Sequence, residues 1–326
     1  MGIPEHLKSF GVSKALDYLE QDPDANLPRL MAWVERFTGG TLFQPRYQEL
    51  LHRAMCDPSN NWYQLIKSMY TDIDNGMLKK IFENFIIHGK LLEWPSRRVK
   101  GTWGDGAAPW AVLIDPTFPC ALGCEGCGAA IYGVRPEMEF DSLDEEIAER
   151  KAKGTHLYIF SGLDPLSQEQ GIIALCNKYS DCVFAAITPP ETINENLAGD
   201  MLRVGNLFPA IRADEDMEKA DEAMALLRRR RLPFGAACRC TAENTDSAAT
   251  DGYFDEMIAR GAKFAWFFTC PAYGPERPAS VEQLKALHQR VTKFRKIKPI
   301  LTLDFWDGPS PAAVPRERVE QEGAEA

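Results

Sequence analysis

The spacing of hydrophobic positions divides the chain into two parts. In the first part, hydrophobic residues recur every three or four positions, as at Val12, Leu16 and Leu19. This is the period of an amphipathic helix. Residues that interrupt helices recur through the same region, at Pro23, Pro28, Gly39 and Gly40. We therefore predict a helical domain over residues 1–95, made of several short helices.

In the second part, short apolar runs alternate with amphipathic helical segments. Strands are predicted at 111–114, 156–160, 183–187, 208–211, 234–238, 264–268 and 300–305. The helices between them are predicted at 170–179, 194–204, 218–230, 254–260 and 281–294, after a first helix that is capped by Asp141 and ends before Gly154. Strands that are apolar on both faces and alternate with helices form a parallel sheet covered by helices.

This pattern predicts an α/β fold, a partial (β/α) TIM-like barrel over residues 110–306. A dinucleotide-binding sheet is disfavoured because no G-x-G-x-x-G follows the first strand. A linker rich in glycine and charge, 96–109, joins the barrel to the helical domain. Residues 307–326 have no apolar period and are expected to form a disordered tail.

Composition narrows the possible partners. The chain has 326 residues, 45% of them hydrophobic, and 47 acidic against 37 basic side chains give a net charge of −10. Such a surface repels phosphate backbones, so no nucleic-acid partner is expected. The one basic run, 228–231, closes a predicted helix and complements its dipole. No apolar stretch is long enough to span a bilayer and the first residues lack a signal peptide's apolar segment, so we expect a cytoplasmic protein without a membrane span.

Three of the nine cysteines form a motif directly after the first predicted strand. Cys120, Cys124 and Cys127 have the spacing C-x-x-x-C-x-x-C in a loop rich in glycine. Active sites of (β/α) barrels are built from the loops at the carboxyl ends of the strands. Three thiolates suit an iron–sulfur cluster, and in a [4Fe-4S] cluster they leave one iron open to a ligand.

Zinc is the alternative metal for these thiolates. A structural zinc site takes four protein ligands, usually as two pairs, and no second C-x-x-C-like pair is present. Inert buried cysteines do not usually lie in a polar, glycine-rich loop. The sequence therefore favours a cluster, and a zinc-thiolate enzyme remains the competing hypothesis.

The cysteine motif after the first strand of a (β/α) chain resembles the radical S-adenosylmethionine superfamily. The resemblance covers roughly residues 60–305. It implies that the open iron of the cluster binds S-adenosylmethionine and that reductive cleavage gives a 5′-deoxyadenosyl radical, which abstracts hydrogen from a substrate. It also implies a low-potential electron donor of the flavodoxin or ferredoxin type, while the substrate stays unidentified.

Within that superfamily, the chain resembles a bacterial group with a helical N-terminal segment. This group usually carries a cysteine-bearing, SPASM-like C-terminal extension, but no cysteine follows Cys270 here. Two interpretations stay open: the protein needs no auxiliary cluster, or the chain is a shortened version.

Several further segments are compared with the family's motifs. Gly162, Leu163, Asp164 and Pro165 are similar to its Gly-Gly-Glu-Pro motif, which hydrogen-bonds the methionyl amine, although Leu163 replaces a glycine and Asp164 is one methylene shorter. The alternative is an ordinary turn with Pro165 starting a helix.

Other positions depart further from the family. Gly126 stands where an aromatic residue is common, 188–190 reads Thr-Pro-Pro in place of Asn-Gly, and Arg212 replaces a serine near the cofactor. Arg212 is expected to pair with a carboxylate of a ligand or in an exposed salt bridge. Thr241 and Asn244, after the fifth strand, are predicted to contact the cofactor.

The remaining chemistry-bearing residues gave weaker signals. Cys238, Cys240 and Cys270 fall at carboxyl ends of strands, where they ligate a second cluster, donate hydrogen or, most often, serve as packing residues. Isolated residues in the helical domain (His52, Cys56 and His88) are expected to be ordinary packed or surface side chains. The departures from the family motifs also leave open a degenerate relative that binds a cluster without catalysis.

Overall fold

The structure is a computed structural model that describes residues 5–38, 45–88, 111–114, 140–162, 164–214, 216–269 and 277–305. Several sequence-based predictions lie outside the described residues: the linker 96–109, the motif cysteines Cys120, Cys124 and Cys127, residues Leu163 and Cys270, and the tail 307–326.

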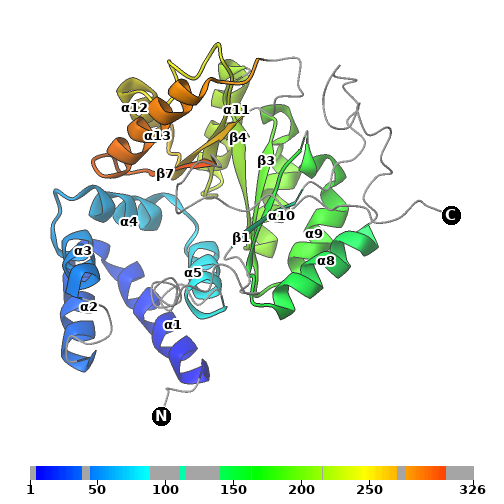
Figure 1. The fold of residues 1–326 in the computed structure, drawn as a ribbon. Coiled ribbons are helices and arrows are strands. Elements are labelled where there is room, and N and C mark those ends of the chain that lie inside the picture. Colours follow the sequence, from blue (N-terminus) through cyan, green and yellow to red (C-terminus); the bar gives the residue numbers. More distant parts are fainter. Residues whose placement is uncertain are drawn as a thin grey trace.

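A seven-stranded parallel sheet forms the centre of the molecule, with its strands in chain order. The sheet curls into a half-barrel, and helices cover its outer face (Figure 1). The strands are β1 (Ala111–Ile114), β2 (Leu157–Phe160), β3 (Val183–Thr188), β4 (Leu207–Arg212), β5 (Gly235–Cys240), β6 (Phe264–Thr269) and β7 (Leu301–Phe305). The predicted α/β partial TIM-like barrel is thereby confirmed.

The helices that follow the strands begin and end close to their predicted bounds. They are α8 (Phe140–Ala152), the 3₁₀ turn η3 (Pro165–Gln168), α9 (Glu169–Lys178), the 3₁₀ turn η4 (Pro190–Thr192), α10 (Glu195–Val204), α11 (Met217–Arg229), α12 (Asp251–Arg260) and α13 (Val281–Arg295). Side-chain caps explain why four of the α-helices start where they do, at Asn194, Asp216, Thr250 and Ser280. The predicted cap at Asp141 is wrong, because α8 already begins at Phe140 and Asp141 lies in its first turn.

The N-terminal region is helical, as predicted. It contains α1 (Glu5–Gln21), α2 (Pro23–Thr38), α3 (Pro45–Cys56), α4 (Asn61–Asp72), α5 (Asn75–Glu83) and the short π-helix η1 (Asn84–His88). Pro28 does not separate two helices but lies inside α2. Its missing N–H leaves the Asp24 carbonyl without its usual donor. The Tyr63 hydroxyl, which donates to the Asp24 carboxylate over 2.9 Å, also lies 3.4 Å from that carbonyl.

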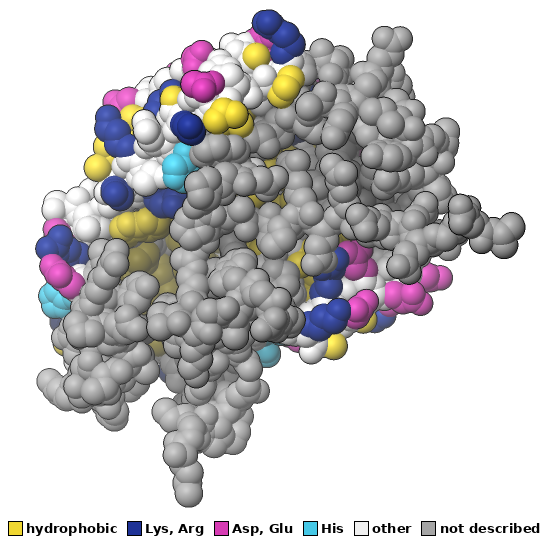
Figure 2. All heavy atoms as spheres, in the orientation of Figure 1, with side chains coloured by type: hydrophobic (Ala, Val, Ile, Leu, Met, Phe, Trp, Pro, Cys, Tyr) yellow, Lys and Arg dark blue, Asp and Glu magenta, His cyan; other side chains and the backbone are white. Residues whose placement is uncertain are grey.

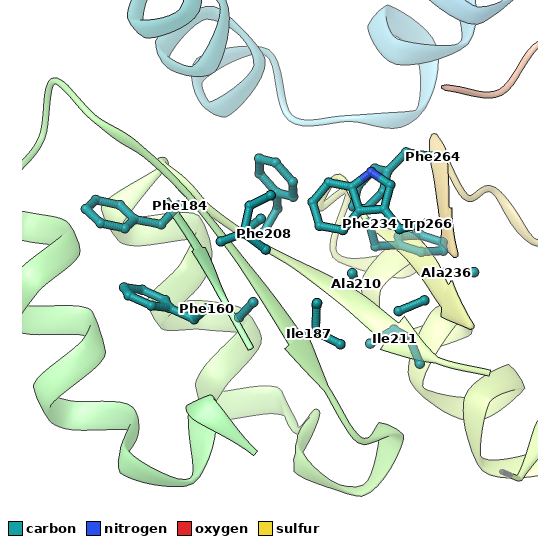
Figure 3. Packing of buried hydrophobic residues seen from close by; sticks show 14 of the residues in the cluster. Phe160, Phe184, Ile187, Phe208, Ala210, Ile211, Phe234, Ala236, Phe264 and Trp266 are labelled. Carbon is teal, nitrogen blue, oxygen red and sulfur yellow. The ribbon is translucent and has the colours of Figure 1, made fainter. Parts of the chain in front are cut away.

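The two faces of the sheet can be told apart from the strand register. Paired residues of parallel strands point to the same side. Phe160 and Phe184 stack face to face against the helices of the outer layer (Figure 3). On the opposite, inner face, the Phe208 ring meets Phe264 edge-on with centroids 5.5 Å apart, and Trp266 lies against Phe264. The inner face of the half-barrel is therefore aromatic from the amino ends of β4 and β6 to the middle of β6.

The last helices of the N-terminal region close the amino end of the sheet. From η1, the Asn84 side chain donates to the carbonyls of Ser180 and Cys182, just before β3, with both bonds 2.9 Å long. From α5, Lys80 donates to the Val204 carbonyl before β4 over 2.6 Å. The nearly buried Lys263, before β6, pairs with Asp72 of α4 at 2.6 Å. The N-terminal helices are thus tied to the barrel at the edge opposite the predicted site.

Acidic and basic side chains alternate on the visible described surface (Figure 2). The basic run at the end of α11 follows this pattern, because Arg229 and Arg230 both donate to the Glu195 carboxylate, over 2.5 and 2.6 Å. This agrees with a solvated helix end rather than a binding patch. None of the helices in the described ranges has the length and apolar character needed to cross a membrane.

Candidate active site

The carboxyl ends of the strands meet at one edge of the half-barrel, and the predicted site residues follow them. Cys120 comes six residues after Ile114, the last residue of β1. The positions of Cys120, Cys124 and Cys127 lie outside the described residues, so their role as cluster ligands stays a prediction. The described residues at this edge are those of the turns after β2, β3, β4 and β5.

The turn after β2 is held against the end of β1. The Ser161 N–H donates to the Ile114 carbonyl over 2.8 Å, which continues the pairing of the two strands into the turn. Gly162 follows with φ of +107°, a conformation that side-chain-bearing residues rarely adopt. Pro165 then begins η3, with Asp164 as its N-cap. The segment that resembles the methionyl-amine motif therefore lies beside the point where the cysteine loop leaves β1.

The Asp164 carboxylate is occupied by protein hydrogen bonds. One oxygen accepts from the Thr188 hydroxyl over 2.9 Å and from the Leu166 N–H over 3.2 Å, and the other accepts from the Thr192 hydroxyl over 2.6 Å. Asp164 thus links the turn after β2 to the end of β3 and to η4. The sequence showed Thr188 and Asp164 as two separate departures from the family motif, whereas the structure joins them. Thr192 was missed, because its place depends on the turn through η4.

Two arginines lie on the inner face near this edge. Arg212 ends β4, on the same face as Phe208, and is half-buried. Among the described residues, its buried Nε has no hydrogen-bond partner. Arg239, on the inner face of β5, lies with Nε 3.9 Å from a carboxylate oxygen of the nearly buried Asp214. The described part of the chain gives Arg212 no salt bridge, so a guanidinium that suits a carboxylate faces the inside of the half-barrel.

Apolar groups line the inner face next to these arginines. The rings of Phe268 and Phe305, on β6 and β7, stack in parallel with their centroids 4.5 Å apart. The indole Nε1 of Trp266 is buried and makes no hydrogen bond in the described part of the structure. A few polar groups on a mostly aromatic surface are typical of sites for organic ligands.

Thr241 and Asn244 close the loop after β5 with their own polar groups. The Asn244 side chain accepts from the Thr241 N–H and donates to the Arg239 carbonyl, with both bonds 2.8 Å long. The Thr241 hydroxyl accepts from the Asn244 N–H over 3.3 Å. These bonds account for the loop's shape, and the predicted contact of both residues with a cofactor stays a prediction.

Cys238 and Cys240 point away from the inner face. Cys238 is paired in register with Phe267, whose ring lies 5.7 Å from that of Tyr253 in the helix layer. Both cysteines are buried there. The hydrogen bond with the Cys240 thiol, followed by burial, raises the pKa of Cys238 well above its usual range. The packing interpretation fits both residues better than a role at the barrel mouth.

The fold is a parallel (β/α) half-barrel with polar side chains at the carboxyl ends of its strands. No protein-family model matches the chain, and no curated protein matches it either. Among solved structures, the fold is similar to that of Streptococcus suis SuiB bound to S-adenosylmethionine. The TM-score is 0.50 at 11% identity, covering 66% of this chain and 55% of SuiB. The match therefore spans about half the length of SuiB.

Two further solved structures show weaker likeness. The radical S-adenosylmethionine methyltransferase TsrM from Kitasatospora setae, with tryptophan and a cofactor analogue bound, matches at a TM-score of 0.36 and 13% identity, covering 52% of this chain and 38% of TsrM. The enzyme anSMEcpe with bound AdoMet matches at a TM-score of 0.41 and 16% identity, covering 60% of this chain and 64% of that one.

Proposed function

We propose that the protein is a radical S-adenosylmethionine enzyme that acts on an organic substrate still to be identified. The observation that carries the proposal is the position of C-x-x-x-C-x-x-C, which begins six residues after the first strand of a parallel half-barrel. When bound, a reduced [4Fe-4S] cluster supplies the electron that cleaves S-adenosylmethionine into methionine and a 5′-deoxyadenosyl radical, which abstracts hydrogen from the substrate.

The residues of the chain fit both cofactors in their chemistry. Cys120, Cys124 and Cys127 offer three thiolates, which leave one iron of a four-iron cluster for S-adenosylmethionine. The backbone at Gly162 is free of a Cβ where it turns beside the end of β1, so its polar groups are approachable by the methionyl ammonium. Arg212 offers a guanidinium to a carboxylate.

Asp164 has a positioning role in this proposal. Its carboxylate holds the turn through Thr188 and Thr192, so the turn keeps its shape without using the carboxylate for the ligand. The aromatic inner face, with Phe268 and Phe305 near the edge, excludes water from the place where a radical would meet its substrate. A flavodoxin- or ferredoxin-type protein is the proposed electron donor.

The test is an anaerobic reconstitution with iron and sulfide, followed by dithionite, S-adenosylmethionine and measurement of 5′-deoxyadenosine. We expect 5′-deoxyadenosine from the unaltered chain and from the control variant Cys56→Ala. Cys56 is the last residue of α3 and is distant in sequence from the motif. The Cys120→Ala, Cys124→Ala, Cys127→Ala variant should give neither the brown cluster absorption nor product. A chain that binds no cluster would overturn the proposal.

The same experiment separates the alternatives. A zinc-thiolate enzyme would give stoichiometric zinc on the motif cysteines, no brown colour and no cleavage of S-adenosylmethionine. A degenerate relative would bind the cluster but give no 5′-deoxyadenosine with dithionite or with a protein electron donor.

A further inference from the structure

A second group of metal-ligating side chains lies at the opposite, amino edge of the sheet. His156 directly precedes β2, and Asp181 and Cys182 directly precede β3. One ligand atom from each of the three residues lies within 4.8 Å of the others. Because β2 and β3 are neighbouring parallel strands, their amino ends bring these two short segments together. The group shares no residue with the candidate active site.

The distances within this group are close to those of a tetrahedral metal site. Nδ1 of His156 lies 3.7 Å from the Cys182 sulfur. Zinc–nitrogen and zinc–sulfur bonds of about 2.05 and 2.3 Å at the tetrahedral angle separate the two ligand atoms by about 3.6 Å. The imidazole and the thiolate therefore need almost no movement to share an ion. The Asp181 carboxylate, within 4.8 Å, needs to close by about 1 Å on the same geometry.

The backbone that carries Cys182 is fixed by other side chains. Asn84 of η1 and the fully buried Asn206 both donate to the Cys182 carbonyl, over 2.9 and 3.0 Å. These bonds hold the sulfur in place before any ion binds, which lowers the ordering cost of binding. The His88 ring, also from η1, stacks on the His156 ring with centroids 5.8 Å apart. His88 is a surface side chain, as expected from the sequence, and this contact places it next to the group.

We propose that His156, Asp181 and Cys182 bind one divalent metal ion of the zinc type, with the exposed His88 as its fourth ligand. Imidazole, thiolate and carboxylate together are a ligand set that zinc accepts. With His88 included, the ion would connect the N-terminal helical region to the barrel. It would have a structural role, at the edge of the fold where stability rather than catalysis is usually found.

One cation borders the group. Lys151 Nζ lies 2.8 Å from both oxygens of the Asp181 carboxylate, so an ion that binds one oxygen replaces one of these two contacts. Nδ1 of His156 lies 3.3 Å from the Asp181 carbonyl, so an ion at Nδ1 replaces this contact and leaves the ring proton on Nε2. Binding would release the Cys182 thiol proton to water, as metal binding by cysteine requires.

The experiment uses the full chain with Cys120, Cys124 and Cys127 changed to Ser, so that the other thiolates cannot bind the probe. The probes are Zn²⁺, measured as metal content after gel filtration, and Co²⁺, measured by absorption. We expect one zinc per chain, a rise in Tm with zinc, and a thiolate-to-cobalt charge-transfer band with the strong visible bands of tetrahedral Co²⁺.

Matched variants assign the ligands. Cys182→Ala and His156→Gln should abolish stoichiometric binding and the zinc-dependent rise in Tm. Cys176→Ala, which removes another fully buried cysteine of the same layer, should keep both. His88→Gln should weaken binding at least about tenfold, the lower end of what metal sites lose with even an outer partner.

Three results would contradict the proposed metal site. Absence of one bound zinc, or cobalt binding without a sulfur charge-transfer band, would overturn the proposal even if Cys182→Ala failed to fold. Retention of metal by Cys182→Ala would overturn it as well. The result is independent of the proposed enzymatic function, because the cluster motif is absent from every protein tested.

Discussion

The two edges of the half-barrel use their polar groups differently. At the amino edge, side chains from the N-terminal helices satisfy the carbonyls that precede the strands, as Asn84 does before β3 and Lys80 before β4. Arg212 at the carboxyl edge and Trp266 in the middle of β6 keep buried nitrogen atoms without a hydrogen-bond partner among the described residues. At the amino edge the protein itself satisfies these carbonyls, although Oδ1 of Asn206 has no partner among the described residues, whereas at the carboxyl edge Arg212 leaves a charged donor for a ligand.

This difference separates stability from function within one sheet. A buried polar group without a partner costs free energy, so such groups persist where a ligand or substrate completes them. The amino edge carries this cost too, at Oδ1 of Asn206, but its many bonds to the N-terminal helices should give it most of the sensitivity to unfolding. The comparison predicts large effects on stability from substitutions at the amino edge and small ones at the carboxyl edge.

The largest effect is expected from Asp72→Ala at the amino edge. This change leaves the Lys263 ammonium nearly buried without its 2.6 Å partner. Removing one member of a buried ion pair costs about 3–5 kcal/mol, and we expect about 2–3 kcal/mol here because Asp72 is partly exposed to water. Urea unfolding at pH 7 measures the loss. Glu49→Ala, which breaks an exposed pair with Arg53, should change the free energy of unfolding by less than about 0.5 kcal/mol.

The charge of Lys263 is unfavourable in the folded protein, whereas the charge of Asp72 is favourable. Burial lowers the pKa of Lys263 in spite of Asp72, so the lysine charge is itself unfavourable, and Lys263→Met should cost less than about 1 kcal/mol. Burial acts to raise the pKa of Asp72, but the bonds and charge of Lys263 bring it below its usual value. The stability from Asp72 is therefore complete above about pH 4 and lost as the pH falls through the lower folded pKa. A cost of Asp72→Ala that stays constant below pH 4 would contradict this.

The next effect is expected from Asn84→Ala, which removes two hydrogen bonds at the amino edge. The carbonyls of Ser180 and Cys182 lose a buried donor, and we expect a loss of about 1–3 kcal/mol in the free energy of unfolding. If the amino edge only stabilises the fold, formation of 5′-deoxyadenosine per folded molecule should not change. A loss of activity without a loss of stability would show that the amino edge also serves function.

The secondary structure was predictable because local patterns and the final fold agree. The strand at Ala111–Ile114 was placed without error, and the others within two residues, since each is an apolar run bounded by polar turns. The capped helix starts at Asn194 and Ser280 follow the same local rule, whereas the start after Thr250 lies three residues before the predicted one. Pro28 does not end a helix because a distant side chain, the Tyr63 hydroxyl, lies at the Asp24 carbonyl that the proline leaves without its donor. The start of α8 lies within two positions of the prediction.

Only the parts of the site that are formed by residues close in sequence could be predicted. The motif after β1 and the turn at Gly162 could be found from spacing. The use of the Asp164 carboxylate by Thr188 and Thr192 could not, because it depends on two strands lying side by side. The same holds for His156 and Cys182, 26 positions apart, which only the parallel pairing of β2 and β3 brings together.

At the carboxyl edge, Gly162→Ala should have an intermediate effect. A φ of +107° is unfavourable for alanine, and we expect a loss of about 1–2 kcal/mol together with reduced cleavage of S-adenosylmethionine, because the turn must change shape. Gly199→Ala is the matched control. Gly199 lies inside α10 with open space around its added Cβ, so this change should raise the free energy of unfolding by about 0.5–1 kcal/mol. Thermal and urea unfolding of the two variants measure the contrast in sign.

The smallest effect on stability, and the sharpest on function, is expected from Arg212→Met. Methionine keeps the length and the apolar stem of the side chain, and it removes a buried Nε that the described protein does not satisfy. The free energy of unfolding should therefore change by less than about 0.5 kcal/mol or rise slightly. If Arg212 binds a carboxylate of the cofactor or substrate, the loss of a charge-assisted hydrogen bond of about 1.5–3 kcal/mol should weaken that ligand's binding roughly tenfold to a hundredfold.

Arg212→Lys separates the contribution of the positive charge from that of the guanidinium geometry. Lysine restores the positive charge but not the planar, two-pronged geometry of the guanidinium, so it should recover only part of the lost affinity. Isothermal titration of S-adenosylmethionine into the anaerobically reconstituted variants, with unfolding measured on the same preparations, gives both quantities. A large loss of stability in Arg212→Met at unchanged affinity would mean that the arginine serves the fold. Arg212 would then stabilise the carboxyl edge of the sheet, as Asn84 and Lys80 stabilise the amino edge.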